Sequence, residues 1–166
     1  MKNIYKINSV HAWNTRSNGE IRNDDAYGNV DTSPQVVLAI LRQLCKKAGI
    51  KQEDIFVGDA FTQMYNHCYN KWSAEFPDIH YMTREPMTGR EVFTKNESKK
   101  INYSDKKSVI SYDSDEIVDQ IANADYLINI PALKAHRWAG VTFLLKIIWL
   151  ARKRKLKSFT QWNTSY

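Results

Sequence analysis

The sequence predicts an α/β domain of three layers with a mostly parallel sheet. Short runs rich in apolar and β-branched residues occur at residues 4–10, 55–59, 79–83 and 126–130. Most segments between these runs carry apolar residues at the three- and four-residue spacing of amphipathic helices. Strands that alternate with helices favour parallel pairing through right-handed crossovers. The 166 residues suffice for one domain with a sizeable core.

The first half of the chain supplies two of these strands and one helix. Residues 4–10 predict a strand, and the polar stretch 14–32 that follows is long for a connection inside a domain, which is typical of a functional or mobile loop. Ser33 and Pro34 predict a helix start, because serine caps helices and proline suits the first helical position. Gly49 is expected to end this helix. The strand at 55–59 closes with Asp59, which could be an acid/base, a ligand or the N-cap of the next helix.

The second half continues the alternation. Residues 61–76 predict a helix whose aromatic stripe is typical of a core, and residues 79–83 predict a strand. Residues 85–107 have no strong period and predict a surface excursion that could contain a hairpin. Ser114 is a good cap for a third helix, which leads into a buried strand at 126–130. The whole order predicts a Rossmann-like domain, although the chain has no Gly-x-Gly-x-x-Gly and no phosphate-binding Walker loop.

The charge distribution and the cysteine content limit the kinds of function that the sequence supports. The net charge of +6 comes from six Lys or Arg within residues 146–158, and the remaining 18 basic residues balance the 18 acidic ones, so nucleic-acid binding by the domain is not expected. Cys45 and Cys68 are expected to be buried thiols, with a disulfide as the alternative. No apolar run approaches the ~20 residues of a membrane span, and no signal peptide is recognisable. The chain is therefore expected to be soluble and cytoplasmic by default, although a longer parent could be exported.

Candidate site residues follow the strand at 126–130. Pro131 closes that strand, and Lys134, His136 and Arg137 come directly after it in a predicted loop. Ligands of open α/β sheets bind in the crevice beyond the carboxyl ends of the strands. A solvated turn is the alternative for this loop. Three further residues lie at the carboxyl ends of other predicted strands and are expected at the same crevice: Asn8, His11 and Asp59. His11 could instead be a partly buried loop histidine with a backbone partner.

These residues carry a resemblance to a family. Residues 125–146, with a strand, Pro-Ala-Leu-Lys-Ala-His and Gly-Val-Thr, resemble the signature of the bacterial domain-of-unknown-function family DUF362. The similarity extends over about residues 2–146. Members are longer at both ends, which implies a fragment and an incomplete sheet. Some relatives carry iron–sulfur motifs, but this chain has no such cysteine motif. Residues 147–166 depart from the family pattern and form a separate basic tail, for which a frameshift and an anionic-membrane segment are both open explanations.

A weaker similarity concerns the amino-terminal domain of the nickel-pincer lactate racemases. His136, Ala139-Gly140 and Lys146 repeat a spacing found there. The resemblance implies that His136 is an acid/base, that Lys146 holds the cofactor, and that the substrate is a 2-hydroxy acid.

The sequence thus predicts a cofactor- or anion-binding enzyme domain. His136, Lys134 and Lys146 would form its proton-exchanging, cationic pocket, since histidine titrates near neutral pH. Asn8, His11, Asp59 and Arg137 would bind a small anionic ligand. No metal-ligand set is recognisable. The alternatives are a non-catalytic ligand- or partner-binding module built from the same loops, and an interaction protein that uses its basic tail.

Overall fold

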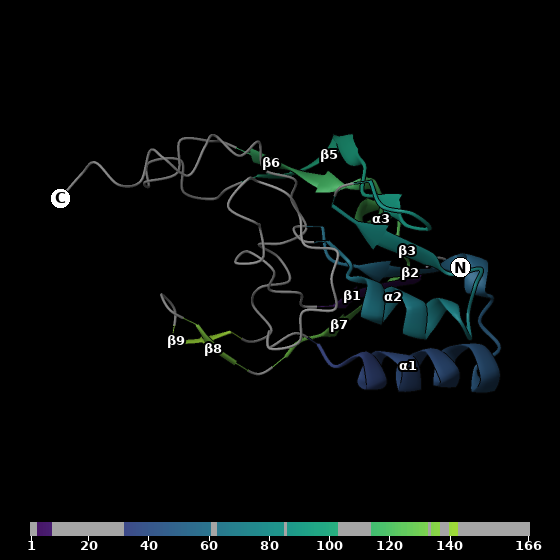
Figure 1. Ribbon diagram of the computed structural model, residues 1–166. Helices are drawn as coiled ribbons and strands as arrows, with labels where there is room; N and C mark the ends of the chain where they lie inside the picture. Colours follow the sequence, from purple (N-terminus) through teal and green to yellow (C-terminus); the bar gives the residue numbers. More distant parts are fainter. Residues whose placement is uncertain are drawn as a thin grey trace.

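The structure, a computed structural model, describes residues 3–7, 32–60, 63–84, 86–102, 114–132, 134–136 and 140–142 (Figure 1). Its centre is a five-stranded sheet with the order β4-β3-β2-β1-β7, in which every pair of neighbours is parallel. The α/β class and the parallel sheet are therefore confirmed. The strands of this sheet are β1 (Asn3–Ile7), β2 (Ile55–Gly58), β3 (His80–Thr83), β4 (Glu91–Val92) and β7 (Tyr126–Ile130).

Two helices cover one face of the sheet. α1 (Pro34–Arg42) and α2 (Asn66–Ser73) lie side by side below the strands in Figure 1. Alternate residues of a strand point to the same side of the sheet, and apolar residues occupy the side that the two helices cover. The cluster beneath them is the larger core of the described part, and its fully or nearly fully buried members include Val37, Leu41, Ile55, Val57, Met64, Trp72, Phe76 and Tyr81.

The third layer contains the short helix α3 (Asp119–Ala122) and a two-stranded antiparallel sheet of β5 (Lys95–Asn102) and β6 (Ser114–Val118). A second core cluster joins this layer to the opposite face of the sheet through Met82, Phe93 and Val118. Two predictions were wrong here. The described residues 86–102 are no surface excursion, because they contribute β4, β5 and the buried Phe93, and Ser114 begins a strand instead of capping a helix.

The helix ends differ in detail from the prediction. Ser33 precedes α1 as expected, but its hydroxyl bonds the side chain of Gln35 and makes no capping bond. α1 continues as a π-helical turn over Gln43–Lys47, and the chain leaves it at Gly49, whose φ of 69° is the left-handed conformation that glycine adopts easily. A 3₁₀ turn over Gln52–Asp54 then leads into β2.

α2 begins later than the predicted residue 61. Its N-cap is Tyr65, so Asp59 is not the cap of this helix. The N–H of Met64, just before the helix, donates instead to the hydroxyl of Thr83 at 3.2 Å. Residues 61 and 62 lie outside the described residues.

β7 is less buried than predicted. Tyr126 is 56% exposed and Leu127 is 40% exposed, and only Ile130, at the carboxyl end of this strand, is buried. The reason is position: among the described strands β7 stands last in the sheet order, with β1 on one side. Although its sequence is mostly apolar, β7 is therefore buried only at its carboxyl end.

Both cysteines are thiols, as predicted. Cys68 is buried and Cys45 is half-buried in the cluster under α1 and α2. Burial raises the pKa of the Cys45 thiol, with a smaller opposing effect from Lys46. A raised pKa lowers the thiolate fraction at neutral pH and with it the reactivity of the thiol. Cys45 and Cys68 are therefore core residues.

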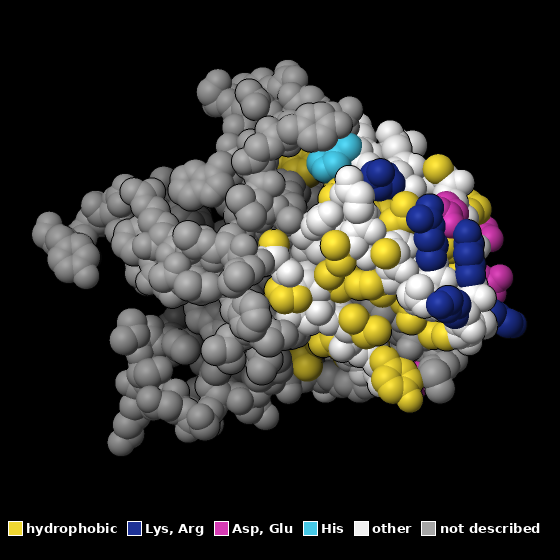
Figure 2. All heavy atoms as spheres, turned by 90° about the horizontal axis from the view of Figure 1, so that it is seen from below, with side chains coloured by type: hydrophobic (Ala, Val, Ile, Leu, Met, Phe, Trp, Pro, Cys, Tyr) yellow, Lys and Arg dark blue, Asp and Glu magenta, His cyan; other side chains and the backbone are white. Residues whose placement is uncertain are grey.

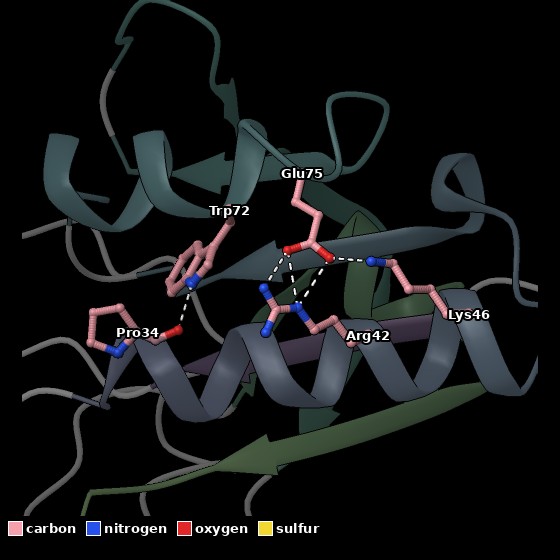
Figure 3. Close-up of polar contacts among 5 residues, drawn as sticks. All are labelled: Pro34, Arg42, Lys46, Trp72 and Glu75. Carbon is pink, nitrogen blue, oxygen red and sulfur yellow. Dashed lines mark hydrogen bonds and ion pairs between the residues drawn. The ribbon is translucent and has the colours of Figure 1, made fainter.

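Glu75 ties the end of α2 to α1. Its carboxylate accepts hydrogen bonds from the guanidinium of Arg42, at 2.7 Å from Nη2 and 3.0 Å from Nε, and forms an ion pair with Lys46 (Figure 3). Figure 2, which views the α1 side, shows Lys and Arg side chains gathered at one end of this face, beyond a region of hydrophobic side chains. Hydrogen bonds from Arg42 and then Lys46 lower the pKa of Glu75 to about 2.

The stability of the fold should therefore fall in acid in part through Glu75. A carboxyl group whose pKa is lowered by folding stabilises the folded state above its ordinary pKa, which is 4.5 for Glu75, and this contribution is lost as the pH falls towards 2. We expect the free energy of unfolding, measured by urea denaturation at about pH 5 and about pH 3, to change less with pH in Glu75→Gln than in the wild type. The same slope in both proteins would contradict this role, and Glu53→Gln, which removes an exposed carboxylate, is the control.

Candidate functional site

The order of the described strands creates a topological switch point. β2, β3 and β4 follow β1 on one side, whereas β7 pairs with β1 on the other. Ile7 and Ile130 are partners in the register, so β1 and β7 end at the same level. In open α/β sheets the ligand crevice lies beyond the carboxyl ends of the strands at such a point. The described carboxyl ends of β1 and β7 therefore lie together at one edge of the sheet.

The start of α1 lies at this edge as well. The hydroxyl of Thr32 donates a 2.6 Å hydrogen bond to the carbonyl of Ile130, the last residue of β7, and the bond is buried. The indole N–H of Trp72 donates a 2.8 Å hydrogen bond to the carbonyl of Pro34, in the first turn of α1 (Figure 3). The N-terminus of a helix carries partial positive charge. The start of α1 therefore favours a negatively charged ligand near this part of the edge.

Asp59 lies where the sequence predicted it, at the carboxyl end of β2. The register pairs Gly58 with Lys6 of β1, so Asp59 is one residue beyond the paired strand. This acidic residue is only 3% exposed. Thr83, at the same level of β3, is fully buried, and its hydroxyl accepts the bond from Met64. Asp59 thus belongs to a buried polar row along the carboxyl edge.

Lys134 and His136 lie in a strand and not in the predicted loop. β8 (Lys134–His136) pairs with β9 (Gly140–Thr142) in an antiparallel ribbon, which Figure 1 shows beyond the end of β7. Three residues of the sequence, 131–133, separate β7 from β8, so the ribbon starts at the switch point. Residues i and i+2 of a strand share one face, so Lys134 and His136 share a face of the ribbon. The remaining predicted site residues lie outside the described residues: Asn8, His11, Arg137 and Lys146.

Asn129 is a candidate that the sequence analysis missed. It stands one residue before the end of β7, opposite Lys6 in the register, and its side-chain Nδ2 is buried with no hydrogen-bond partner among the described residues. A buried amide without a partner is uncommon in folded proteins and calls for an explanation such as a ligand or water. The signal was present in the sequence, because Asn129 interrupts the apolar run Tyr-Leu-Ile-Asn-Ile.

Removing the Asn129 amide should stabilise the protein. An unpartnered buried polar group costs about 1–3 kcal/mol, so we expect Asn129→Leu to raise the free energy of unfolding by about 1 kcal/mol in the absence of ligand. Urea denaturation measures this difference. Asn70→Leu, at an exposed position of α2, is the control and should change stability by less than about 0.5 kcal/mol. A destabilised Asn129→Leu protein would show that the amide has a structural partner.

The described part of the chain has neither a metal-binding cluster nor a membrane-spanning helix. Among the described residues, no three His, Cys, Asp or Glu side chains gather as a bound metal ion would require. No helix in the same part of the chain is long and apolar enough to cross a bilayer.

Comparison with known proteins identifies one family. The family model described as "Domain of unknown function (DUF362)" matches residues 20–159, which is most of the chain and includes every described element from α1 to β9. No curated protein and no solved structure matches the chain. The similarity to the nickel-pincer lactate racemases therefore remains a prediction from the sequence.

Proposed function

We propose that this chain, which belongs to the DUF362 family, is an enzyme domain that binds a small anionic ligand or cofactor at the carboxyl edge of its sheet. One observation carries the proposal. The switch point between β1 and β7 receives the start of α1, through the Thr32 to Ile130 hydrogen bond, and is followed directly by the ribbon with Lys134 and His136. This arrangement supports the proposal because α/β sheets bind ligands beyond the carboxyl ends of their strands at such a point, and helix N-termini favour anions.

The proposed roles follow from the chemistry of each group. Lys134 supplies a positive charge for a carboxylate or phosphate. His136 exchanges protons near neutral pH. Lys146 would complete this catalytic set, and Asp59, Asn8, His11 and Arg137 would contact the substrate. A non-catalytic binding module would use the same edge for affinity alone, without proton transfer.

Ligand titration tests the proposal. We expect the full chain to bind acetate, lactate or inorganic phosphate, followed by NMR chemical shifts, and Lys134→Ala to weaken binding about tenfold, because hydrogen bonds to charged groups contribute about 1.5–3 kcal/mol. Lys51→Ala removes the same charge just before β2, at the opposite end of the strands, and should bind like the wild type. Equal weakening by both variants would mean that binding depends on the total charge of the protein and not on Lys134. If no probe binds, the proposal is refuted.

Turnover separates the enzyme from the binding module. An acid/base role for His136 predicts interconversion of D- and L-lactate, by α-proton or by hydride transfer, that His136→Ala loses while binding persists. Intact mass and elemental analysis of the same samples detect an adduct on Lys146 or bound nickel, which the racemase similarity predicts. Binding without interconversion of D- and L-lactate in the wild type would favour the non-catalytic module.

A further inference from the structure

The register of the β8–β9 ribbon places a third polar residue beside Lys134 and His136. Lys134 is opposite Thr142, Ala135 is opposite Val141, and His136 is opposite Gly140. Directly opposed residues of an antiparallel pair share a face of the sheet. Thr142 therefore belongs to the face of Lys134 and His136.

The two faces of the ribbon differ in character. By register and residue type, Ala135 and Val141 occupy positions on one face of the ribbon, and Lys134, His136 and Thr142 occupy positions on the other. Opposed Cβ atoms lie about 4.5–5.5 Å apart, and residues i and i+2 about 7 Å apart. Lys134, His136 and Thr142 thus occupy three neighbouring positions within the width of a small ligand.

Gly140 is the fourth residue of the polar face. A glycine inside a strand weakens pairing and often marks a place where a ligand or another backbone comes close. Because glycine has no side chain, the position directly opposite His136 contributes only backbone to this face.

We propose that Thr142 is a ligand-binding residue of the same site and that Lys134, His136 and Thr142 on one face of the ribbon together bind an oxyanion, with Gly140 leaving room for it. The inference rests on the proposed function and adds to it. An ammonium, an imidazole and a hydroxyl can all donate hydrogen bonds, and this face of the described ribbon carries no carboxylate that would repel an anion. The oxyanion could belong to a carboxylate or to a phosphate.

A matched pair of substitutions tests the assignment. Thr142→Val keeps the β-branched shape and removes the hydroxyl, whereas Val141→Thr adds a hydroxyl on the opposite face. In NMR titrations of the full chain with acetate and with inorganic phosphate, we expect Thr142→Val to weaken binding about tenfold and Val141→Thr to leave it within about twofold. Thr142→Ser retains the hydroxyl and should bind like the wild type. The stronger of the two probes identifies the class of oxyanion.

The outcomes distinguish a failure of this inference from a failure of the proposed function on which it rests. If Lys134→Ala weakens binding but Thr142→Val does not, Thr142 is no ligand residue and the proposed function stands. If the wild type binds neither probe, both fail. Amide spectra of each variant report folding. If Thr142→Val does not fold, Thr142→Ala replaces it, and wild-type affinity in that variant overturns the assignment.

Discussion

Trp72→Ala should lower the free energy of unfolding by about 3–5 kcal/mol, the loss typical of a large aromatic side chain removed from a core. Trp72 of α2 is fully buried in the core that α1 and the sheet share with this helix, and its ring stacks on that of Tyr81 with 6.4 Å between centroids. Its indole N–H also donates a hydrogen bond to the carbonyl of Pro34 (Figure 3). Because domains of this size are stable by about 5–15 kcal/mol, the variant should be close to unfolding.

Urea denaturation followed by circular dichroism measures the loss without relying on tryptophan emission. Trp72→Phe keeps an aromatic ring in the cluster and loses the hydrogen bond, so it should cost about 1–2 kcal/mol. Lys71→Ala, the exposed neighbour in α2, should change stability by less than about 0.5 kcal/mol. A loss below about 1 kcal/mol for Trp72→Ala would mean that α1 and α2 do not share one core.

The main features of the fold could be predicted because they have local signals. Four of the five described strands of the sheet, β1, β2, β3 and β7, fall in runs rich in apolar residues, and Pro34 and Gly49 mark the ends of the first helical segment. The errors fall where distant pairing overrides local preference. Ser-Asp-Glu-Ile-Val at residues 114–118 has the composition of a capped helix start, yet it pairs with β5 and becomes a strand.

The candidate site could be predicted in outline for a related reason. Parallel strands end at one edge, so Asp59, and the sequence that follows β7, could be assigned to that edge from strand order alone. The position of Lys134 opposite Thr142 depends on the register of β8 and β9, which no local pattern specifies. The Thr32 to Ile130 bond joins residues that are 98 positions apart, so no local pattern could predict it either.

Gly58→Val should disrupt the sheet directly beside Asp59. Gly58 pairs with Met82, and a Cβ on Gly58 would collide with the Met82 carbonyl oxygen and lie 2.7 Å from its Cβ. The carbonyl is backbone in the middle of the sheet and cannot rotate away, so β2 and β3 would have to separate. We expect a loss of about 3 kcal/mol in the free energy of unfolding, at the upper end of the usual cost of overpacking.

Gly49→Ala distinguishes this clash from a general intolerance of glycine substitution. A Cβ on Gly49 would meet open space, but the positive φ of 69° means that alanine there suffers backbone strain alone and should cost about 1 kcal/mol. Thermal denaturation ranks the two variants, and equal losses would mean that the β2–β3 contact at Gly58 can relax. Because Asp59 follows Gly58 directly, a strand separation there should also weaken anion binding at the carboxyl edge, whereas Gly49→Ala should leave binding unchanged. This second measurement links the packing of β2 against β3 to the proposed site.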